Sequence, residues 1–254
     1  MPLFRKLTGV GIFFLAFFLI SSFRVPDPEP DSAILIRFRV YVHGIPLQLN
    51  KKYKNPFGEE FEISLFRFYT GKISLVDANG TKKTQADKSY HLVDLSDSSS
   101  TLFEIRVPVG KYREMSFRLG VDSTDQNRGA QTGALDPKKG MFWTWNSGYL
   151  SFKMEGSSMA SNQPAHLIAY HIGGYRSPYS AVWKIKLVPE SILHTSAQKK
   201  ILVEIPIEMD HLFNGQFAMQ IKDIPDCTTP GALARKISRN FAGAFTGMTI
   251  IENP

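Results

Sequence analysis

The alternation of apolar and polar side chains is the feature that most constrains how this chain can fold. On a β-strand, successive side chains point to opposite faces of the sheet, so a period of two predicts a strand with one buried face. The first clear segment spans residues 34–43. Its buried positions are Ile34, Ile36, Phe38, Val40 and Val42, which alternate with Leu35, Arg37, Arg39, Tyr41 and His43.

The same signal recurs along the chain, and turn-forming sequences such as Asp77-Ala78-Asn79-Gly80 and Gly173-Gly174 separate the segments. Many short strands at this spacing, with few helical segments, are typical of a sandwich of two sheets. We therefore predict an all-β fold, an antiparallel β-sandwich that is immunoglobulin-like in style. The further predicted strands are residues 61–69, 72–76, 102–107, 112–119, 149–154, 166–172, 181–188 and 201–207.

One C-terminal helix is expected after the last of these strands. Thr229 is a suitable N-cap and Pro230 suits the first helical position. Apolar residues then recur every four positions and would pack one helix face against the sandwich. These residues are Leu233, Ile237, Phe241 and Phe245.

The N-terminus has the pattern of a secretory signal. Arg5 and Lys6 precede an apolar run over residues 10–20, and Ser21 and Ser22 follow it. The run is short for a membrane-spanning helix, although retention as an uncleaved anchor is the alternative. We predict a signal peptide over residues 1–22, an acidic, proline-punctuated linker over 23–32 and a single domain over 33–254. The protein is then periplasmic or extracellular.

Cysteine content and charge narrow the class of protein further. Cys227 is the one cysteine, so the chain can form no internal disulfide, and we expect its thiol to be buried. The formal net charge is +7, but the basic residues are scattered and form no long run. This distribution is typical of a solvated surface and does not indicate nucleic-acid binding.

The block from Gly140 to Tyr149 contains two of the three tryptophans, Trp143 and Trp145, one residue apart. On a strand the two indoles would lie side by side on one face. A pair of this kind serves either a dense core or a surface task. The irregular segment from Asp122 to Gly140 leads into this block, and loops of that length are often functional or tightly self-packed.

Few residues outside this block suggest chemistry. His43 and His171 each end a predicted strand beside a glycine turn, but the short histidine motifs of zinc enzymes are absent. A metal site would have to be assembled from distant parts of the chain. Hydrolase motifs are also absent, so we expect no enzyme. The segment from Asp122 to Asn127 has oxygen ligands for Ca²⁺, although side chains that cap their own backbone are the preferred interpretation.

Several motifs together resemble the MbnP family of exported copper-binding proteins, and in particular its Bacteroidetes-type branch. The similarity runs from about Ile34 to the C-terminal helix. The motifs are Ser64 to Tyr69, Tyr90 to Asp94, Gly120 to Ser123, Gly133 to Pro137, Gly140 to Tyr149 and His171 to Gly174.

The resemblance implies a β-sandwich that binds one copper ion for uptake, storage or delivery. It also implies that Trp143, the first tryptophan of the pair, is oxidised to kynurenine by a dihaem cytochrome c peroxidase of the MauG type. His43 and His171 match the early and late histidines of the family and are the expected ligands beside the modified Trp143. We expect a monomer. The alternative is a cell-surface interaction module that binds sugar or protein through an exposed patch of Trp143 and Trp145.

Overall fold

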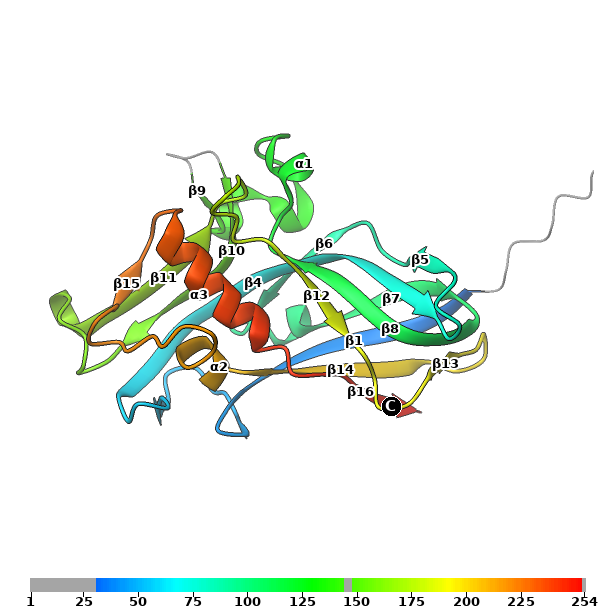
Figure 1. The fold of residues 1–254 in the computed structure, drawn as a ribbon, viewed down its shortest axis with the longest axis horizontal. Helices are drawn as coiled ribbons and strands as arrows, with labels where there is room; N and C mark the ends of the chain where they lie inside the picture. Colours follow the sequence, from blue (N-terminus) through cyan, green and yellow to red (C-terminus); the bar gives the residue numbers. More distant parts are fainter. Residues whose placement is uncertain (1–30, 144–147, 253–254) are drawn as a thin grey trace, which may run out of the picture.

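The computed structural model describes residues 31–143 and 148–252, which form two packed β-sheets with a helix alongside (Figure 1). The predicted signal peptide and Trp145 lie outside the described residues. Within the described part of the chain, no helix is both long enough and apolar enough to span a bilayer.

The smaller sheet is built around β1, which pairs in parallel with β14 and antiparallel with β2 and β7. Its strands are β1 (Asp31–Val42), β2 (Ile45–Pro46), β7 (Leu102–Pro108), β14 (Ile201–Glu208) and β16 (Thr249–Glu252).

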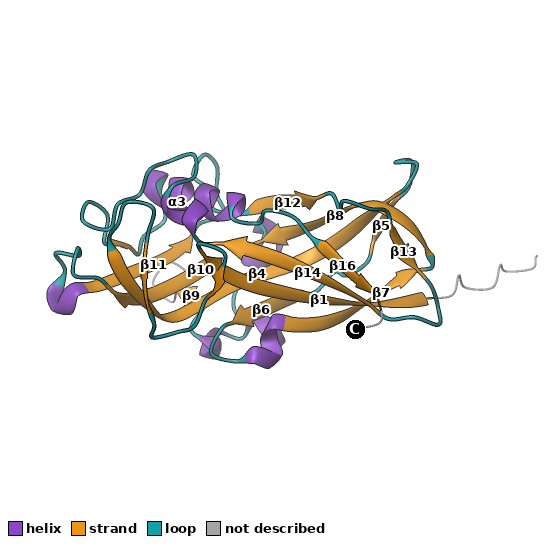
Figure 2. Ribbon diagram, turned by 90° about the horizontal axis from the view of Figure 1, so that it is seen from below, coloured by secondary structure: helices purple, strands orange, loops and turns teal. Residues whose placement is uncertain are grey.

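The larger sheet has the order β12-β8-β4-β10-β11-β15, and short strands pair with β4, β8 and β10. Figure 2 shows the strands of both sheets running along the length of the molecule. The strands are β3 (Lys52–Lys54), β4 (Glu60–Asp77), β5 (Lys83–Gln85), β6 (Tyr90–Asp94), β8 (Gly110–Leu119), β9 (Phe142–Trp143), β10 (Gly148–Ser157), β11 (Leu167–Gly173), β12 (Trp183–Leu187), β13 (Leu193–Thr195) and β15 (Asp226–Cys227).

The helices are short apart from α3, which lies along β11 and β12 (Figure 1). They are α1 (Ser123–Gln126), α2 (Asp210–Phe213) and α3 (Ala232–Gly243), with 3-10 turns η1 (Ser98–Thr101), η2 (Gly133–Leu135), η3 (Pro137–Lys139) and η4 (Pro164–His166).

The main core lies between the two sheets, as the alternation predicts. Phe38 of β1 contacts Phe68 of β4 and Phe117 of β8, with ring centroids 5.4 and 5.8 Å apart. Phe241 of α3 closes the same core, because its ring centroid lies 4.5 Å from that of Phe152. The predicted β-sandwich with one C-terminal helix is confirmed, with two parallel strand pairs, β1–β14 and β11–β15, in addition to the antiparallel ones.

Two of the differences from the sequence prediction concern the central strand and the start of the C-terminal helix. The segments 61–69 and 72–76 form one continuous strand, β4, because Gly71 stays paired with both β6 and β8. A side chain at Gly71 would collide with the carbonyl oxygen of Ser89.

The C-terminal helix also begins later than expected. Its N-cap is Gly231, and Thr229 and Pro230 lie before the first turn. The preceding residues are held elsewhere, because Cys227 pairs with Tyr170 in the sheet and the Thr229 carbonyl oxygen lies 3.9 Å from the Cys227 sulfur. Cys227 is buried as predicted, and burial raises the pKa of its thiol to about 11.

Candidate metal site

Trp143 lies in a second apolar cluster, on the outer face of the larger sheet. Trp143 belongs to β9, where it pairs with Gly148 of β10, and only 7% of its surface is exposed to solvent. The edge of its six-membered ring lies against β11, since a Cβ atom built on Gly173 would come within 2.7 Å of Trp143 Cζ3. Trp143 is therefore a packed residue and does not form an exposed aromatic patch. The buried members of the cluster are Tyr69, Tyr90, Val121, Leu135, Met141, Trp143, Tyr149 and Leu150.

The segment from Asp122 to Gly140 folds over this cluster and is fixed to β10 by polar contacts. The Tyr149 hydroxyl donates to the Leu135 carbonyl oxygen at 2.9 Å and accepts from the Gln131 backbone N–H at 2.9 Å. The Gln126 side-chain oxygen accepts from the Tyr149 backbone N–H at 2.7 Å. Burial raises the pKa of Tyr149, which keeps its phenol protonated in these contacts. The long irregular loop is thus a lid that covers the apolar cluster around Trp143.

Asp122 caps the first turn of α1, as the sequence predicts. Its carboxylate accepts from the backbone N–H groups of Thr124 and Asp125 at the start of α1. The side chain therefore caps its own backbone.

His171 is the predicted ligand that lies nearest to Trp143. His171 and Gly173 are two residues apart on β11, so they share its outer face, and their Cα atoms are separated by roughly 7 Å. Trp143 packs against Gly173, which places the indole and the imidazole on the same side of the sheet.

The surroundings of His171 favour a neutral ring with one free nitrogen. Nε2 donates to Glu155 Oε1 at 2.7 Å, and the same carboxylate oxygen lies 3.0 Å from Lys153 Nζ. Burial lowers the pKa of His171, partly against the effect of Glu155. Nδ1 has no hydrogen-bond partner among residues 31–143 and 148–252. A neutral imidazole whose second nitrogen is held by a carboxylate is the usual form of a histidine ligand.

His43 is in a different part of the molecule. Its Nε2 donates to the Lys54 carbonyl oxygen at 2.8 Å, and Nδ1 lies 2.6 Å from Asp210 Oδ2. Neither ring nitrogen can bind a metal without giving up a contact, since each already faces an acceptor oxygen.

The strand register separates His43 from His171. Lys54, whose carbonyl oxygen accepts the hydrogen bond from His43, pairs with Glu60 at one end of β4. Arg67 of β4 pairs with Lys153, which is opposite His171. The seven steps along β4 from Glu60 to Arg67 span roughly 23 Å. The structure brings Trp143 and His171 to one face and leaves His43 at the far end.

The described ranges contain no group of three or more His, Cys, Asp or Glu side chains arranged to hold a metal ion. The residues present therefore fit a metal only in part, with one available imidazole nitrogen at His171 and the carboxylate of Glu155 beside it. The sequence did not single out Glu155. No spacing in the sequence indicates it, because the contact depends on the β10–β11 register.

Comparisons with known proteins agree with this fold. The family model described as MbnP matches residues 31–229. In the solved structure of MbnP from Methylosinus trichosporium, the matched region covers 88% of this chain and 99% of that one, with 14% sequence identity and a TM-score of 0.52. Among curated proteins the sequence search finds no match.

The likeness to the solved structure supports the β-sandwich fold, and the match to the family model supports membership of the MbnP family. The assignment to the Bacteroidetes-type branch stays a prediction. The family is secreted or periplasmic and is associated with copper and methanobactin. The match spans most of the chain, which is thus a member of the MbnP family.

Proposed function

We propose that this chain is an exported copper-binding protein that serves copper uptake, storage or delivery and has no enzymatic activity of its own. The proposed site lies on the outer face of the larger sheet, with His171 and an oxidised Trp143 as ligands. The observation that carries the proposal is the position of Trp143 against Gly173, on the same strand face as the neutral His171.

Oxidation of Trp143 would supply the donor that the unmodified side chain lacks. The indole nitrogen is only a donor, so it offers no lone pair to a metal. A dihaem cytochrome c peroxidase of the MauG type, acting with hydrogen peroxide, would insert one oxygen atom at each of the two pyrrole carbons as their bond breaks. Each oxygen atom comes from one peroxide, which is reduced to water. Hydrolysis of the formyl group then releases formate and leaves kynurenine, whose aryl amine and ketone can approach a metal.

Copper suits this donor set. Imidazole and amine nitrogens bind Cu²⁺ more tightly than the other divalent first-row metals. When bound, copper would be the cargo of the protein. His171 would bind through Nδ1 while Glu155 keeps Nε2 and fixes the orientation of the ring.

Copper content and intact mass after coexpression with the peroxidase test the proposal. We expect one copper per chain and a mass change at Trp143 that equals the loss of one carbon and the gain of one oxygen. His171→Ala should lose copper, because it removes the available imidazole nitrogen.

His43→Ala is the matched control, since the sequence suggested both histidines. It should keep the copper and lose less than about 1 kcal/mol of stability, the value of a surface ion pair. Tight copper binding by a chain with unmodified Trp143 would refute the dependence on kynurenine. Loss of copper from His43→Ala alone would move the site to the other end of the sandwich.

A further inference from the structure

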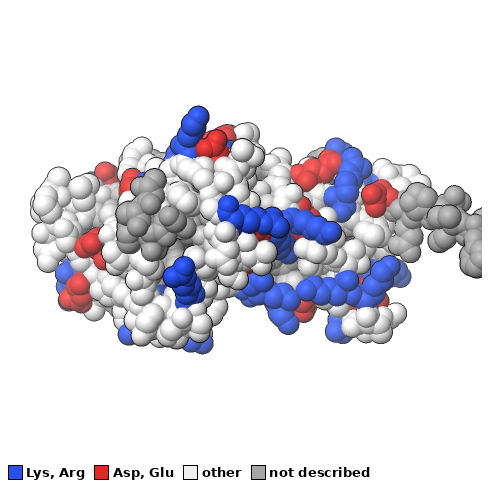
Figure 3. All heavy atoms as spheres, turned by 90° about the horizontal axis from the view of Figure 1, so that it is seen from above, with Lys and Arg blue, Asp and Glu red and all other residues white. Residues whose placement is uncertain are grey.

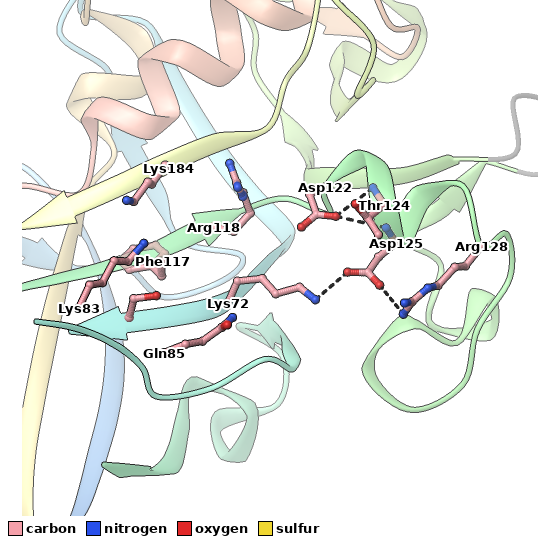
Figure 4. Close-up of a pocket in the computed structure, with 11 residues that line it drawn as sticks. Lys72, Lys83, Gln85, Phe117, Arg118, Asp122, Thr124, Asp125, Arg128 and Lys184 are labelled. Atoms are coloured by element: carbon pink, nitrogen blue, oxygen red, sulfur yellow. Dashed lines mark hydrogen bonds and ion pairs between the residues drawn. The ribbon is translucent and has the colours of Figure 1, made fainter. Parts of the chain in front are cut away.

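A basic pocket lies on the outer face of the larger sheet, beside the lid segment and apart from the proposed copper ligands. It has a volume of about 530 Å³ and is bounded by β4, β5, β8, β12 and α1 (Figure 4). This volume is within the range of small-molecule sites. Figure 3 shows Lys and Arg side chains gathered over the half of this face where β5, β8 and β12 lie.

The pocket is lined by the short side chain of Ser74 and by long basic side chains. Ser74 of β4 and Ser116 of β8 are paired across the two strands and are both buried. Ser74 lines the pocket together with the much longer side chains of Lys83, Arg118 and Lys184.

The acidic residues at the pocket are already engaged. The two carboxylate oxygens of Asp125 lie 2.8 Å from Lys72 Nζ and 2.9 Å from Arg128 Nη1, so this side chain is already paired with two cations. Asp122 uses its carboxylate to cap α1. Five basic and two acidic residues line the pocket, which leaves three positive charges in excess.

The three remaining cations are Lys83, Arg118 and Lys184. Arg118 and Lys184 are directly opposite on β8 and β12, an arrangement that destabilises a sheet when both residues carry the same charge. Burial and the neighbouring Lys83 lower the pKa of Lys184, and only Glu114 acts on it in the opposite direction. Lys83, Arg118 and Lys184 form no ion pair with an acidic residue among the described residues.

We propose that this pocket is a binding site for an oxyanion with at least two negative charges, and specifically for a phosphate group, held by Lys83, Arg118 and Lys184. A dianion would neutralise more of the excess charge than a single carboxylate. The guanidinium of Arg118 can offer two parallel hydrogen bonds to phosphate oxygens, and the two ammonium groups act as point charges. The volume leaves room for an organic group attached to the phosphate.

Calorimetric titration of the full exported chain, treated with a chelator to remove copper, tests this site. Inorganic phosphate should bind at least about tenfold more tightly than acetate. The double variant Lys83→Gln/Lys184→Gln should weaken phosphate binding by at least about tenfold, because hydrogen bonds to charged groups contribute that much each.

The double variant Lys51→Gln/Lys222→Gln is the matched control, since it removes the same charge from exposed lysines outside the pocket. Equal weakening in both double variants, or no measurable phosphate binding, would overturn the proposal. Vesicles containing phosphatidylglycerol provide a further arm. The proposal would also be overturned if the protein bound these vesicles but not free phosphate, and if the pocket variant lost the vesicle binding. That result would identify a membrane surface as the ligand. None of these results depends on copper, so the site and the proposed copper function fail separately.

Discussion

At the scale of single residues, the arrangement around Trp143 depends on a missing side chain. Gly173 has no Cβ, and this allows the indole to lie against β11 and to share a face with His171. The alternating pattern of β11 is compatible with any small residue at position 173. Glycine is required there because of the contact with Trp143, thirty residues earlier in the chain.

Gly173→Ala should displace Trp143. The added methyl group would lie 2.7 Å from Cζ3, and overpacking of this kind costs about 1–3 kcal/mol of stability. Urea unfolding of the unmodified protein measures the loss, and the fraction of chains converted by the peroxidase should fall as well. Gly243→Ala is the control, because its Cβ would meet nothing within 4 Å and alanine favours the helix. Equal stability of the two variants would contradict the contact between Trp143 and Gly173.

At the scale of elements, the lid over residues 122–140 is held by side chains rather than by a strand ladder. The Tyr149 hydroxyl satisfies two backbone groups of the lid, as a buried loop requires, and Gln126 of the lid accepts from the Tyr149 backbone N–H. A sequence shows that such a loop is long and polar, but it does not show which tyrosine it folds over.

Tyr149→Phe should loosen this lid. Removal of the hydroxyl leaves the Gln131 N–H and the Leu135 carbonyl without this partner, which costs about 1–3 kcal/mol. Hydrogen exchange should become faster in residues 122–140 before it changes in β1 or β14. Tyr175→Phe removes an exposed hydrogen bond to Asn127 and should change stability by less than about 0.5 kcal/mol. Unchanged exchange in the lid of Tyr149→Phe would refute this role.

At the scale of the whole molecule, α3 connects the two sheets through the main core. The matched family region ends at residue 229, before α3 begins at Ala232. Phe241 is nevertheless fully buried and contacts Phe66, Phe68 and Phe152. The helix is therefore an integral part of this core.

Phe241→Ala should destabilise the entire protein by about 3–5 kcal/mol, as expected for a large cavity in a core. Circular dichroism and tryptophan fluorescence should report the same urea midpoint, because one core joins both sheets. Leu233→Ala, on the same helix but partly exposed at 36%, should cost less than about 1 kcal/mol. A small effect of Phe241→Ala would show that α3 is only peripheral.

The sequence by itself determined the sandwich, the C-terminal helix and the burial of Cys227. Those features follow from local periodicity and composition, which strands and helices express directly. The motifs around Trp143 and His171 also identified the family.

Only the tertiary structure decided which candidate residues meet. His43 and His171 look equivalent in the sequence, since each ends a strand beside a glycine turn, yet the register of β4 with β3 and β10 puts them far apart. Pairing between distant strands sets the partners of a side chain, and no local pattern encodes that register. Glu155, the lid over Trp143 and the basic pocket beside it therefore became visible only in three dimensions.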